Sequence, residues 1–341
     1  MNTTINDVAD EAGVSITTVS RVLNNNYPVK KETRERIEKA IKKLDYTPNA
    51  MARSLITKKT SMIGVIVPGL TNLFFPTIVE AIGEFTKKNG YSISLCSTGG
   101  DPIVEQNLSD ALISRQVDGI IAIDPSIECL DNGYYSKLSD RIPVIIVNGY
   151  PNGYKCNFVS YDEEVGCKEA FDYLIGLGHK KIAFIRGGKS YSYDIKEKMY
   201  NEVLKENSFS YENIVRLKLG NSIEVIEHSK EAIKAILTIE ERPTAIFACN
   251  DLMAVGAIQA CQTLGFKVPE DISIIGFDNT IISDITSPRL TSVDQNMKDI
   301  GKRAAIELLD IIENDIKIRK KIILDTNLVI KDSCSRASEV K

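Results

Sequence analysis

The chain has 341 residues, of which 43% are hydrophobic and 26% charged, a balance typical of soluble globular proteins with two or three domains. No apolar run is long enough to span a membrane, and MNTTINDVADEAG lacks the basic flank and apolar stretch of a signal peptide. We therefore expect a cytoplasmic protein without a membrane partner. Its seven cysteines form no C-x-x-C pair, which favours reduced thiols over disulfides or zinc.

The net charge of −4 hides an asymmetry along the chain. Residues 1–60 hold 11 Lys and Arg against 7 Asp and Glu, whereas the remainder holds 31 against 39. A small basic head on an acidic body is compatible with nucleic-acid binding by the head, although the average charge argues against it.

Two short helices joined by a tight turn are predicted for residues 3–24, TTINDVADEAGVSITTVSRVLN. Thr4 can cap the first helix, Gly13 ends it, and Ser15 can cap the second, which runs to about Asn24. Val19, with Val22 and Leu23, faces inward at helical spacing. This leaves on the outer surface Ile16, Thr17, Thr18, Ser20 and Arg21.

Hydroxyls and amides on such a surface can bond phosphates or base edges, and one arginine can pair with guanine through two hydrogen bonds. The alternative is a polar, solvated helix pair in any small helical domain. A third amphipathic helix is predicted at 32–46, with Ile37, Ala40, Ile41 and Leu44 on one face. Pro48 then opens a helical segment too short to be stable alone in water.

The segments INDVADEAGVSITTVSRVLNN and YTPNAMARSL, with the body described below, resemble the lactose/galactose repressor (LacI/GalR) family of bacterial transcriptional regulators from residue 4 to about 331. The resemblance implies a helix-turn-helix whose second helix enters the major groove, with Ile16, Thr17 and Arg21 at the base-reading positions. It also implies a hinge segment that folds on operator DNA and wedges Leu55 into the minor groove. The predicted DNA-binding residues are Thr4, Ser15, Ile16, Thr17, Thr18, Ser20, Arg21, Asn24, Asn49, Ala52, Arg53 and Leu55. One departure is Lys30, which stands where the family often has a serine cap.

From Ser61 onward the sequence pattern is one of apolar strands that alternate with amphipathic helices. This pattern predicts parallel sheets covered by helices on both faces. Strands are expected at 61–69, 91–98, 117–124 and 142–150, and in a second series at 180–188, 212–220, 244–250 and 271–279. The fold class is thus an all-α helix-turn-helix head followed by an α/β body. The body has two doubly wound parallel-sheet lobes, which resemble the periplasmic-binding-protein type.

The expected domains are a helix-turn-helix domain at 1–47, a hinge helix and linker at 48–60, and a two-lobed effector-binding and dimerisation domain at 61–331. Lobe 1 comprises about 61–159 plus 293–322, because the helix at 296–315 is expected to return to it. Lobe 2 comprises about 160–290 plus 324–331, and 332–341 form a tail.

Small ligands bind beyond the carboxyl ends of parallel strands, so the predicted site is the cleft between the lobes. The strand ends offer Asn72, Phe74, Phe75, Asn148, Asn250 and Asp278. Amides, a carboxylate and aromatic rings suit a sugar or polyol, and the family resemblance implies effector contacts at all of these positions except the first. The alternative for each is a turn residue or a helix cap.

The sequence departs from the family pattern near this site at two positions. The arginine that the family usually places on the helix after IAFI falls on Ile195, and a usual glycine falls on Tyr200. Arg186, at the end of the preceding strand, could project into the cleft instead, so we include it among the expected effector residues. An unusual effector or a protein co-repressor therefore stays open.

Other function classes find little support. The GGKS at 187–190 would need glycine at 183 to form a phosphate loop, and that residue is Ala183. The two histidines lie in no recognisable metal or nucleophile pattern, so we expect no catalytic residue, metal or cofactor, and no enzyme. A transport binding protein would share the lobes but would need a signal peptide and no basic head.

The resulting hypothesis is a homodimeric repressor that binds a pseudo-palindromic double-stranded DNA operator under control of a sugar-like effector in the cleft. The tail IKDSCSRASEVK has no leucine heptads, which favours a dimer over a tetramer. One alternative is a catabolite-control-type regulator that responds to a phosphorylated partner protein. Another is a small-molecule-binding module without DNA activity.

Overall fold

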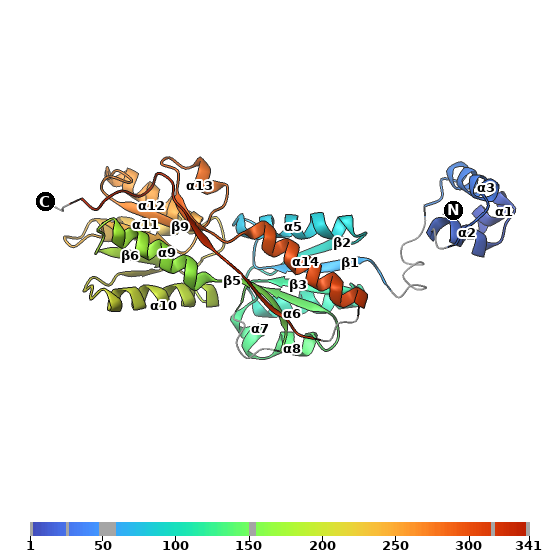
Figure 1. The fold of residues 1–341 in the computed structure, drawn as a ribbon, viewed down its shortest axis with the longest axis horizontal. Helices are drawn as coiled ribbons and strands as arrows, with labels where there is room; N and C mark the ends of the chain where they lie inside the picture. The colour runs from blue at the N-terminus through green and yellow to red at the C-terminus, as the bar shows by residue number, and fades with distance from the viewer. Residues whose placement is uncertain (1–2, 25–26, 48–58, 150–154, 315–317, 339–341) are drawn as a thin grey trace. The chain divides into compact units, whose positions relative to one another are not determined.

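The structure is a computed structural model that describes residues 3–24, 27–47, 59–149, 155–314 and 318–338 (Figure 1). The chain divides into two compact units, the head Met1–Thr60 and the body Ser61–Lys341. Among the described residues, no helix is long and apolar enough to cross a membrane.

The head contains three helices, α1 (Ile5–Ala12), α2 (Ile16–Asn24) and α3 (Lys31–Lys43). Thr4 caps α1 reciprocally: its hydroxyl accepts from the Asp7 amide at 3.4 Å, and the Asp7 carboxylate accepts from the Thr4 amide at 2.8 Å. Gly13 ends the helix with φ 63°, as expected of a left-handed cap.

The predicted inner faces of the head form one core. Buried side chains from all three helices meet there: Val8, Ala9, Ala12, Val19, Val22, Ile37 and Ala40. Lys30 occupies the N-cap position of α3 and makes no capping hydrogen bond with its side chain, so the first turn of this helix lacks the cap that a serine would supply. The predicted helix-turn-helix and third helix are confirmed.

Lobe 1 is a six-stranded sheet in the order β11-β5-β4-β3-β1-β2, with all neighbouring strands parallel. Its strands are β1 (Met62–Val67), β2 (Ser92–Ser97), β3 (Gly119–Ile123), β4 (Val144–Val147), β5 (Asn157–Tyr161) and β11 (Lys321–Leu324). Its helices are α5 (Phe74–Lys88), α6 (Pro102–Ser114), α7 (Ile127–Asp131), α8 (Tyr134–Leu138) and α14 (Met297–Asn314). Ile63 and Val65 of β1 pack beneath α5 and α14, whereas Ile66 packs on the opposite face with α6 to α8, as the two-residue period of a strand requires.

Lobe 2 repeats the plan in the order β12-β10-β9-β8-β6-β7, parallel except for β12 against β10. Its strands are β6 (Ile182–Arg186), β7 (Ile214–Arg216), β8 (Ala245–Ala248), β9 (Ser273–Asp278), β10 (Thr291–Asp294) and β12 (Asn327–Val329). Its helices are α9 (Glu163–Gly176), α10 (Tyr191–Glu206), α11 (Val225–Leu237), α12 (Asp251–Leu264) and α13 (Ile282–Ile285). The predicted pair of doubly wound lobes is confirmed.

Three segments carry the chain between the lobes, from β5 to α9, from β10 to α14, and from β11 to β12 (Figure 1). The last helix returns to lobe 1 as expected, where α14 packs against α5 and covers β3, β4 and β5. Four short strands, β5, β10, β11 and β12, were not among the predicted ones. They border these crossings and extend both sheets.

The segment after β12 packs against lobe 2 and does not project as a separate tail. Ser333 is fully buried, and its hydroxyl donates to the Ile274 carbonyl at 2.5 Å and accepts from the Thr291 amide at 2.8 Å. His179 bonds the Ser335 carbonyl at 3.0 Å, and burial lowers the pKa of its ring. The described part of this segment therefore belongs to the lobe 2 fold.

Candidate functional site

The outer face of α2 presents the side chains expected to read DNA. Ser15, Thr17 and Arg21 are exposed, Ile16 is 48% exposed, and Thr18 and Ser20 are half-buried. Ser15 also caps the helix, because its hydroxyl accepts from the Thr18 amide at 3.3 Å. Thr4 is exposed but its hydroxyl is committed to the α1 cap.

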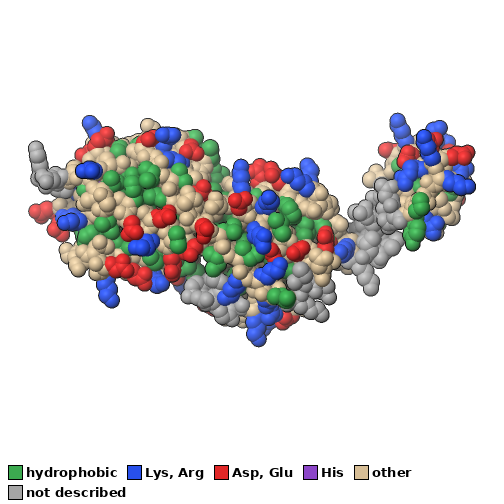
Figure 2. Space-filling view, in the orientation of Figure 1, with side chains coloured by type: hydrophobic (Ala, Val, Ile, Leu, Met, Phe, Trp, Pro, Cys, Tyr) green, Lys and Arg blue, Asp and Glu red, His purple; other side chains and the backbone are tan. Residues whose placement is uncertain are grey.

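Arg21 contacts Tyr27, an aromatic residue that was not among the predicted DNA-binding residues. The Arg21 guanidinium lies 5.3 Å from the centroid of the Tyr27 ring, and Tyr27 is 65% exposed. This cation–π contact restrains the arginine beside the α2 surface. On the face of the head seen in Figure 2, Lys and Arg side chains stand out with acidic side chains among them.

Some predicted DNA-binding residues have no described side chain. Asn24 is the last residue of α2, but only its backbone is described. The hinge positions lie outside the described residues, namely Asn49, Ala52, Arg53 and Leu55.

The two lobes close over a small polar cavity of about 20 Å³ at the carboxyl ends of their strands. Six of the seven predicted effector residues line it: Asn72, Phe74, Phe75, Asn148, Asn250 and Asp278. The lining also includes residues that the sequence analysis did not select: Asp124, Tyr161, Ser190, Ser192, Tyr193, Lys196, Asn221, Cys249 and Gln295. Asp124 ends a predicted strand, so the strand-end rule could have found it.

Amides hold the carboxylates and helix ends around the cavity. Asn148 Nδ2 donates to Asp124 at 3.2 Å, and Asn221 Nδ2 reaches the same carboxylate from lobe 2 at 3.4 Å. Asn250 caps α12, because its Oδ1 accepts from the Met253 amide at 2.9 Å, while its Nδ2 donates to the Gly220 carbonyl at 2.8 Å. Asn250 is therefore a helix cap that also lines the cavity, and its role as an effector contact stays a prediction.

Lys196 is the one lysine or arginine among the described residues that line this cavity. It is 2% exposed, and its Nζ lies 3.5 Å from Glu163, 3.0 Å from the Ser192 hydroxyl and 3.7 Å from the centroid of the Phe277 ring. It follows Ile195, the position to which the resemblance assigned the missing arginine. The helix α10 begins at Tyr191 and turns Ser192, Tyr193 and Lys196 inward.

Arg186 does not line the cavity, so the structure contradicts its expected projection into the cleft. Its guanidinium donates to Glu197 at 2.5 Å, Asp194 at 2.7 Å and the Gly188 carbonyl at 3.0 Å. Because four of its N–H groups are used in this way or on the Gly187 carbonyl, it secures the loop between β6 and the first turns of α10.

Burial dominates the ionisation of the cavity. It raises the pKa of Asp124 to about 7, with a further rise from Glu163. Burial and then Asp251 raise the pKa of Asp278 well above its ordinary value. The pKa of the Cys249 thiol rises to about 12 for the same first reason, so this cysteine is a buried, unreactive side chain.

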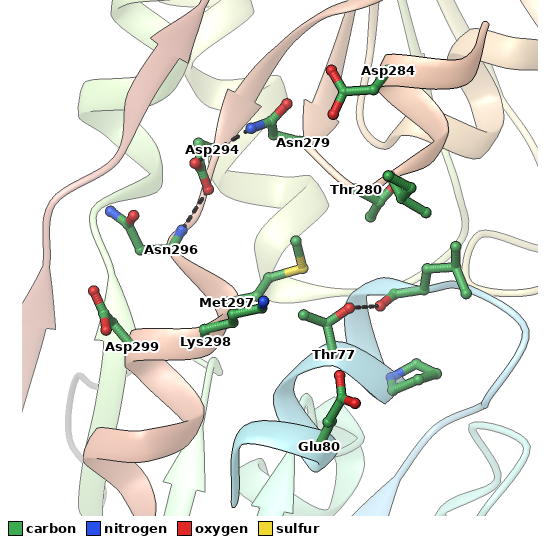
Figure 3. Close-up of a pocket in the computed structure, with 13 residues that line it drawn as sticks. Thr77, Glu80, Asn279, Thr280, Asp284, Asp294, Asn296, Met297, Lys298 and Asp299 are labelled. Carbon is green, nitrogen blue, oxygen red and sulfur yellow. Dashed lines mark hydrogen bonds between the residues drawn. The ribbon is translucent and has the colours of Figure 1, made fainter. Parts of the chain in front are cut away.

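A larger groove of about 900 Å³, the surface groove, opens where α13, the N-terminus of α5 and the N-terminus of α14 meet (Figure 3). Asp294 anchors one wall, accepting from Asn279 Nδ2 at 3.3 Å and from the Asn296 amide at 2.8 Å. None of the predicted effector residues lines this groove. Among the described residues, no three His, Cys, Asp or Glu side chains are grouped to hold a metal ion.

Known proteins share this two-unit plan. Residues 4–49 match the model for bacterial regulatory proteins of the lacI family, and residues 171–334 match the periplasmic binding protein-like domain. The HTH-type transcriptional regulator DegA of Bacillus subtilis is 35% identical over 98% of this chain and 99% of its own length. The catabolite control protein A of Priestia megaterium is 35% identical over 96% of each chain.

Solved structures agree with these relatives. The lac repressor dimer bound to operator and the anti-inducer ONPF superposes with a TM-score of 0.85, at 26% identity over 98% of this chain and 100% of that chain. The complex of the transcriptional regulator CelR with cellobiose gives a TM-score of 0.71, at 26% identity over 97% and 100%. The chain therefore belongs to the lacI family of bacterial regulatory proteins and is a DNA-binding regulator of transcription.

Proposed function

We propose that the protein is a homodimeric repressor that binds a pseudo-palindromic operator and is controlled by a small polyhydroxylated effector, a sugar or a derivative, in the cleft between its lobes. The observation that carries the proposal is the cavity itself, which gathers amides, carboxylates and aromatic rings from strand ends of both lobes. The protein acts by binding rather than by catalysis, and we place it in the cytoplasm with the DNA that it regulates.

The DNA end of the proposal depends on α2. Its exposed face carries hydroxyls, Ile16 and a restrained Arg21, a set able to contact phosphates, a thymine methyl and a guanine edge. The related lac repressor structure is a dimer bound to operator, which supports two heads on adjacent half-sites.

Control by an effector depends on contacts between the two lobes across the cleft. Asn221 of lobe 2 donates to Asp124 of lobe 1, and the Ile223 amide donates to the Thr71 hydroxyl at 3.1 Å. The cavity of about 20 Å³ is too small for a sugar, so the lobes must separate to admit one. A ligand that contacts both lobes changes their equilibrium, and through the dimer it changes the affinity for DNA.

Selection of bound sequences from random duplex DNA tests this function. The full-length protein is used at a stated salt concentration, because phosphate contacts make affinity salt-dependent. We expect a pseudo-palindromic motif, and its affinity should change when a cleft-binding sugar is added. Recovery of a single half-site, or of no motif with any candidate ligand, would contradict the dimeric operator reading.

The surface groove gives little support to control by a phosphorylated protein. Its charged lining consists of Glu80, Asp284, Asp294 and Asp299 against the one lysine Lys298 (Figure 3). Such a surface repels a phosphoryl group. A thermal-shift screen of the full chain with sugars, and separately with a phosphorylated carrier protein, distinguishes the two controls.

A further inference from the structure

The cleft cavity contains more carboxylates than cations. Lys196 forms an ion pair with Glu163, with 3.5 Å between Nζ and Oε1, and both side chains are buried. Asp124, which is half-buried, and Asp278, which is buried, also line the cavity, and neither forms an ion pair within 4.0 Å of a described lysine or arginine. Buried carboxylates ordinarily have a cationic partner or several hydrogen bonds, because burying a charge is costly.

The hydrogen bonds to these two carboxylates come from neutral amides. Asp124 accepts from Asn148 at 3.2 Å and from Asn221 at 3.4 Å, both of them long. Asp278 accepts from Gln295 Nε2 at 2.5 Å. Amide donors do not neutralise a carboxylate, so the negative charge of each ionised group is not balanced by these contacts.

Gln295 gives an independent indication that a hydrogen-bond donor belongs here. The side chain is 1% exposed and lines the cavity, and its Nε2 is used on Asp278. Its Oε1 has no hydrogen-bond partner among the described residues. A buried acceptor without a donor is costly, and this one adjoins the carboxylate that lacks a cation.

The space next to the cavity is also lined by more carboxylates than cations among the described residues. A hollow of about 310 Å³ shares Asp124, Ser190 and Asn221 with the cavity, so the two are adjacent. Its other charged lining residues are Glu105, Glu128 and Lys189, and the lysine lies 3.9 Å from Glu128. An approaching cation is therefore attracted along the way to the cavity.

The ionisation of the two carboxylates is consistent with a missing cation. Burial and Glu163 raise the pKa of Asp124 to about 7, and burial and Asp251 raise the pKa of Asp278 well above its ordinary value. Lys196 lowers both but does not offset the burial. A positive charge placed beside them restores the ionised forms and releases protons.

We propose that the effector carries a protonated amine on a polyhydroxylated scaffold, as in an amino sugar, and that Asp124 and Asp278 bind its ammonium group. An ammonium N–H also supplies the donor that Gln295 Oε1 lacks, while Asn72 and Asn148 serve the hydroxyls and the aromatic side chains of the cavity cover the ring. The inference rests on the proposed function, because it names the chemical class of the cleft effector.

Isothermal titration calorimetry on the full chain tests the proposal with matched sugars. The probes are glucose, galactose and mannose, and the same hexoses with one hydroxyl replaced by an amine at C2, C3 or C6. We expect at least one amino hexose to bind ten-fold or more tightly than its parent. Asp278→Asn and Asp124→Asn should each reduce this preference to less than about three-fold. Glu80→Gln, which removes an exposed carboxylate of the surface groove, should preserve it.

Two further readouts guard against a folding artefact. Each variant is first shown to unfold cooperatively within a few degrees of the parent protein. Titrations at pH 6 in two buffers of different ionisation enthalpy then count protons. The amino hexose should release protons on binding to the parent protein and fewer on binding to Asp278→Asn.

The outcomes separate this inference from the proposed function. A neutral hexose that binds as tightly as its amino counterparts overturns the ammonium proposal and leaves a sugar-controlled cleft intact. If no hexose of either class binds while the protein still selects an operator, both the ammonium proposal and the sugar-like effector are overturned. An amine preference that survives both aspartate substitutions also overturns the assignment.

Discussion

Arg21 is the one charged side chain on the exposed face of α2, and its contact with Tyr27 limits its freedom. The guanidinium lies 5.3 Å from the Tyr27 ring centroid, so part of the entropy of ordering the arginine is lost before DNA binds. An arginine held in this way favours directed contacts to a base edge over diffuse attraction to phosphates.

Arg21→Ala should weaken operator binding by roughly 1–3 kcal/mol and relax the preference at one base position in each half-site, because a two-bond contact to guanine is lost. Titration and sequence selection at fixed salt measure both effects. Arg36→Ala, which removes an exposed arginine of α3, should leave the sequence preference unchanged. An unaltered preference in Arg21→Ala would show that this residue contacts only the backbone.

Asp124 should make the ligand-free protein less stable as the pH rises. Its pKa is about 7 in the folded protein against 3.8 for the ordinary side chain, first because of burial and then because of Glu163, while Lys196 opposes the rise and Glu105 adds to it. The folded state thus binds more protons between about pH 4 and pH 7, and the free energy of unfolding falls through that window.

Asp124→Asn should remove this fall and stabilise the ligand-free protein at pH 8 relative to the parent by about 1–3 kcal/mol, a discounted value because the side chain is half-buried. Urea unfolding at pH 5 and pH 8 measures the difference in both proteins. Parallel pH dependences in the two would mean that Asp124 is solvated in the ligand-free state.

At the scale of elements, the close approach of α14 to α5 fixes one wall of lobe 1. Gly301 lies at this contact, and a Cβ there would be 2.6 Å from the Ile78 carbonyl oxygen and 3.0 Å from the Ala81 Cβ. The glycine thus allows two helices that are remote in sequence to pack, and α14 starts directly after the crossing at β10.

Gly301→Ala should destabilise the protein by about 1–3 kcal/mol, because the backbone oxygen of α5 cannot move aside as a flexible side chain could. This cost exceeds the gain of about 0.5–1 kcal/mol from replacing a helical glycine. Gly176→Ala in α9 is the control, since nothing lies within 4 Å of its Cβ position, and it should be neutral or stabilising. Equal urea midpoints for the two variants would show that α5 and α14 separate easily.

At the scale of the whole molecule, the body is two lobes joined by three crossings, and the C-terminal segment completes the second lobe. Ser333 links β9 and the start of β10, because its hydroxyl bonds the Ile274 carbonyl and the Thr291 amide. The segment after β12 is therefore part of the lobe that carries Asp278.

Ser333→Ala should lower the free energy of unfolding by about 1–3 kcal/mol, because the Thr291 amide loses its partner in a buried position. Denaturant unfolding of the full chain, followed through lobe 2, measures the loss. Ser338→Ala, an exposed position in the same segment, should have no effect. If the two variants match, the segment is a dispensable tail.

The sequence by itself determined the features that depend on neighbours along the chain. Helical spacing predicted the core of the head through Val19 and Val22, and Thr4 predicted the α1 cap. Alternating strands and helices predicted the two parallel sheets, and the strand-end rule located six residues that line the cavity. These signals are local, since they arise from the 3.6-residue and two-residue periods and from turn chemistry.

Only the tertiary structure decided which side chains share the cavity. Arg186 ends β6 and Lys196 lies on the helix that follows, yet Arg186 turns to Glu197 and Asp194 while Lys196 enters the cavity. Asp124 and Gln295 line the same cavity although they lie about 170 residues apart in the sequence. The direction in which a helix turns its charges depends on the face that it buries against other elements, here α9 and β6, and no local period encodes that contact.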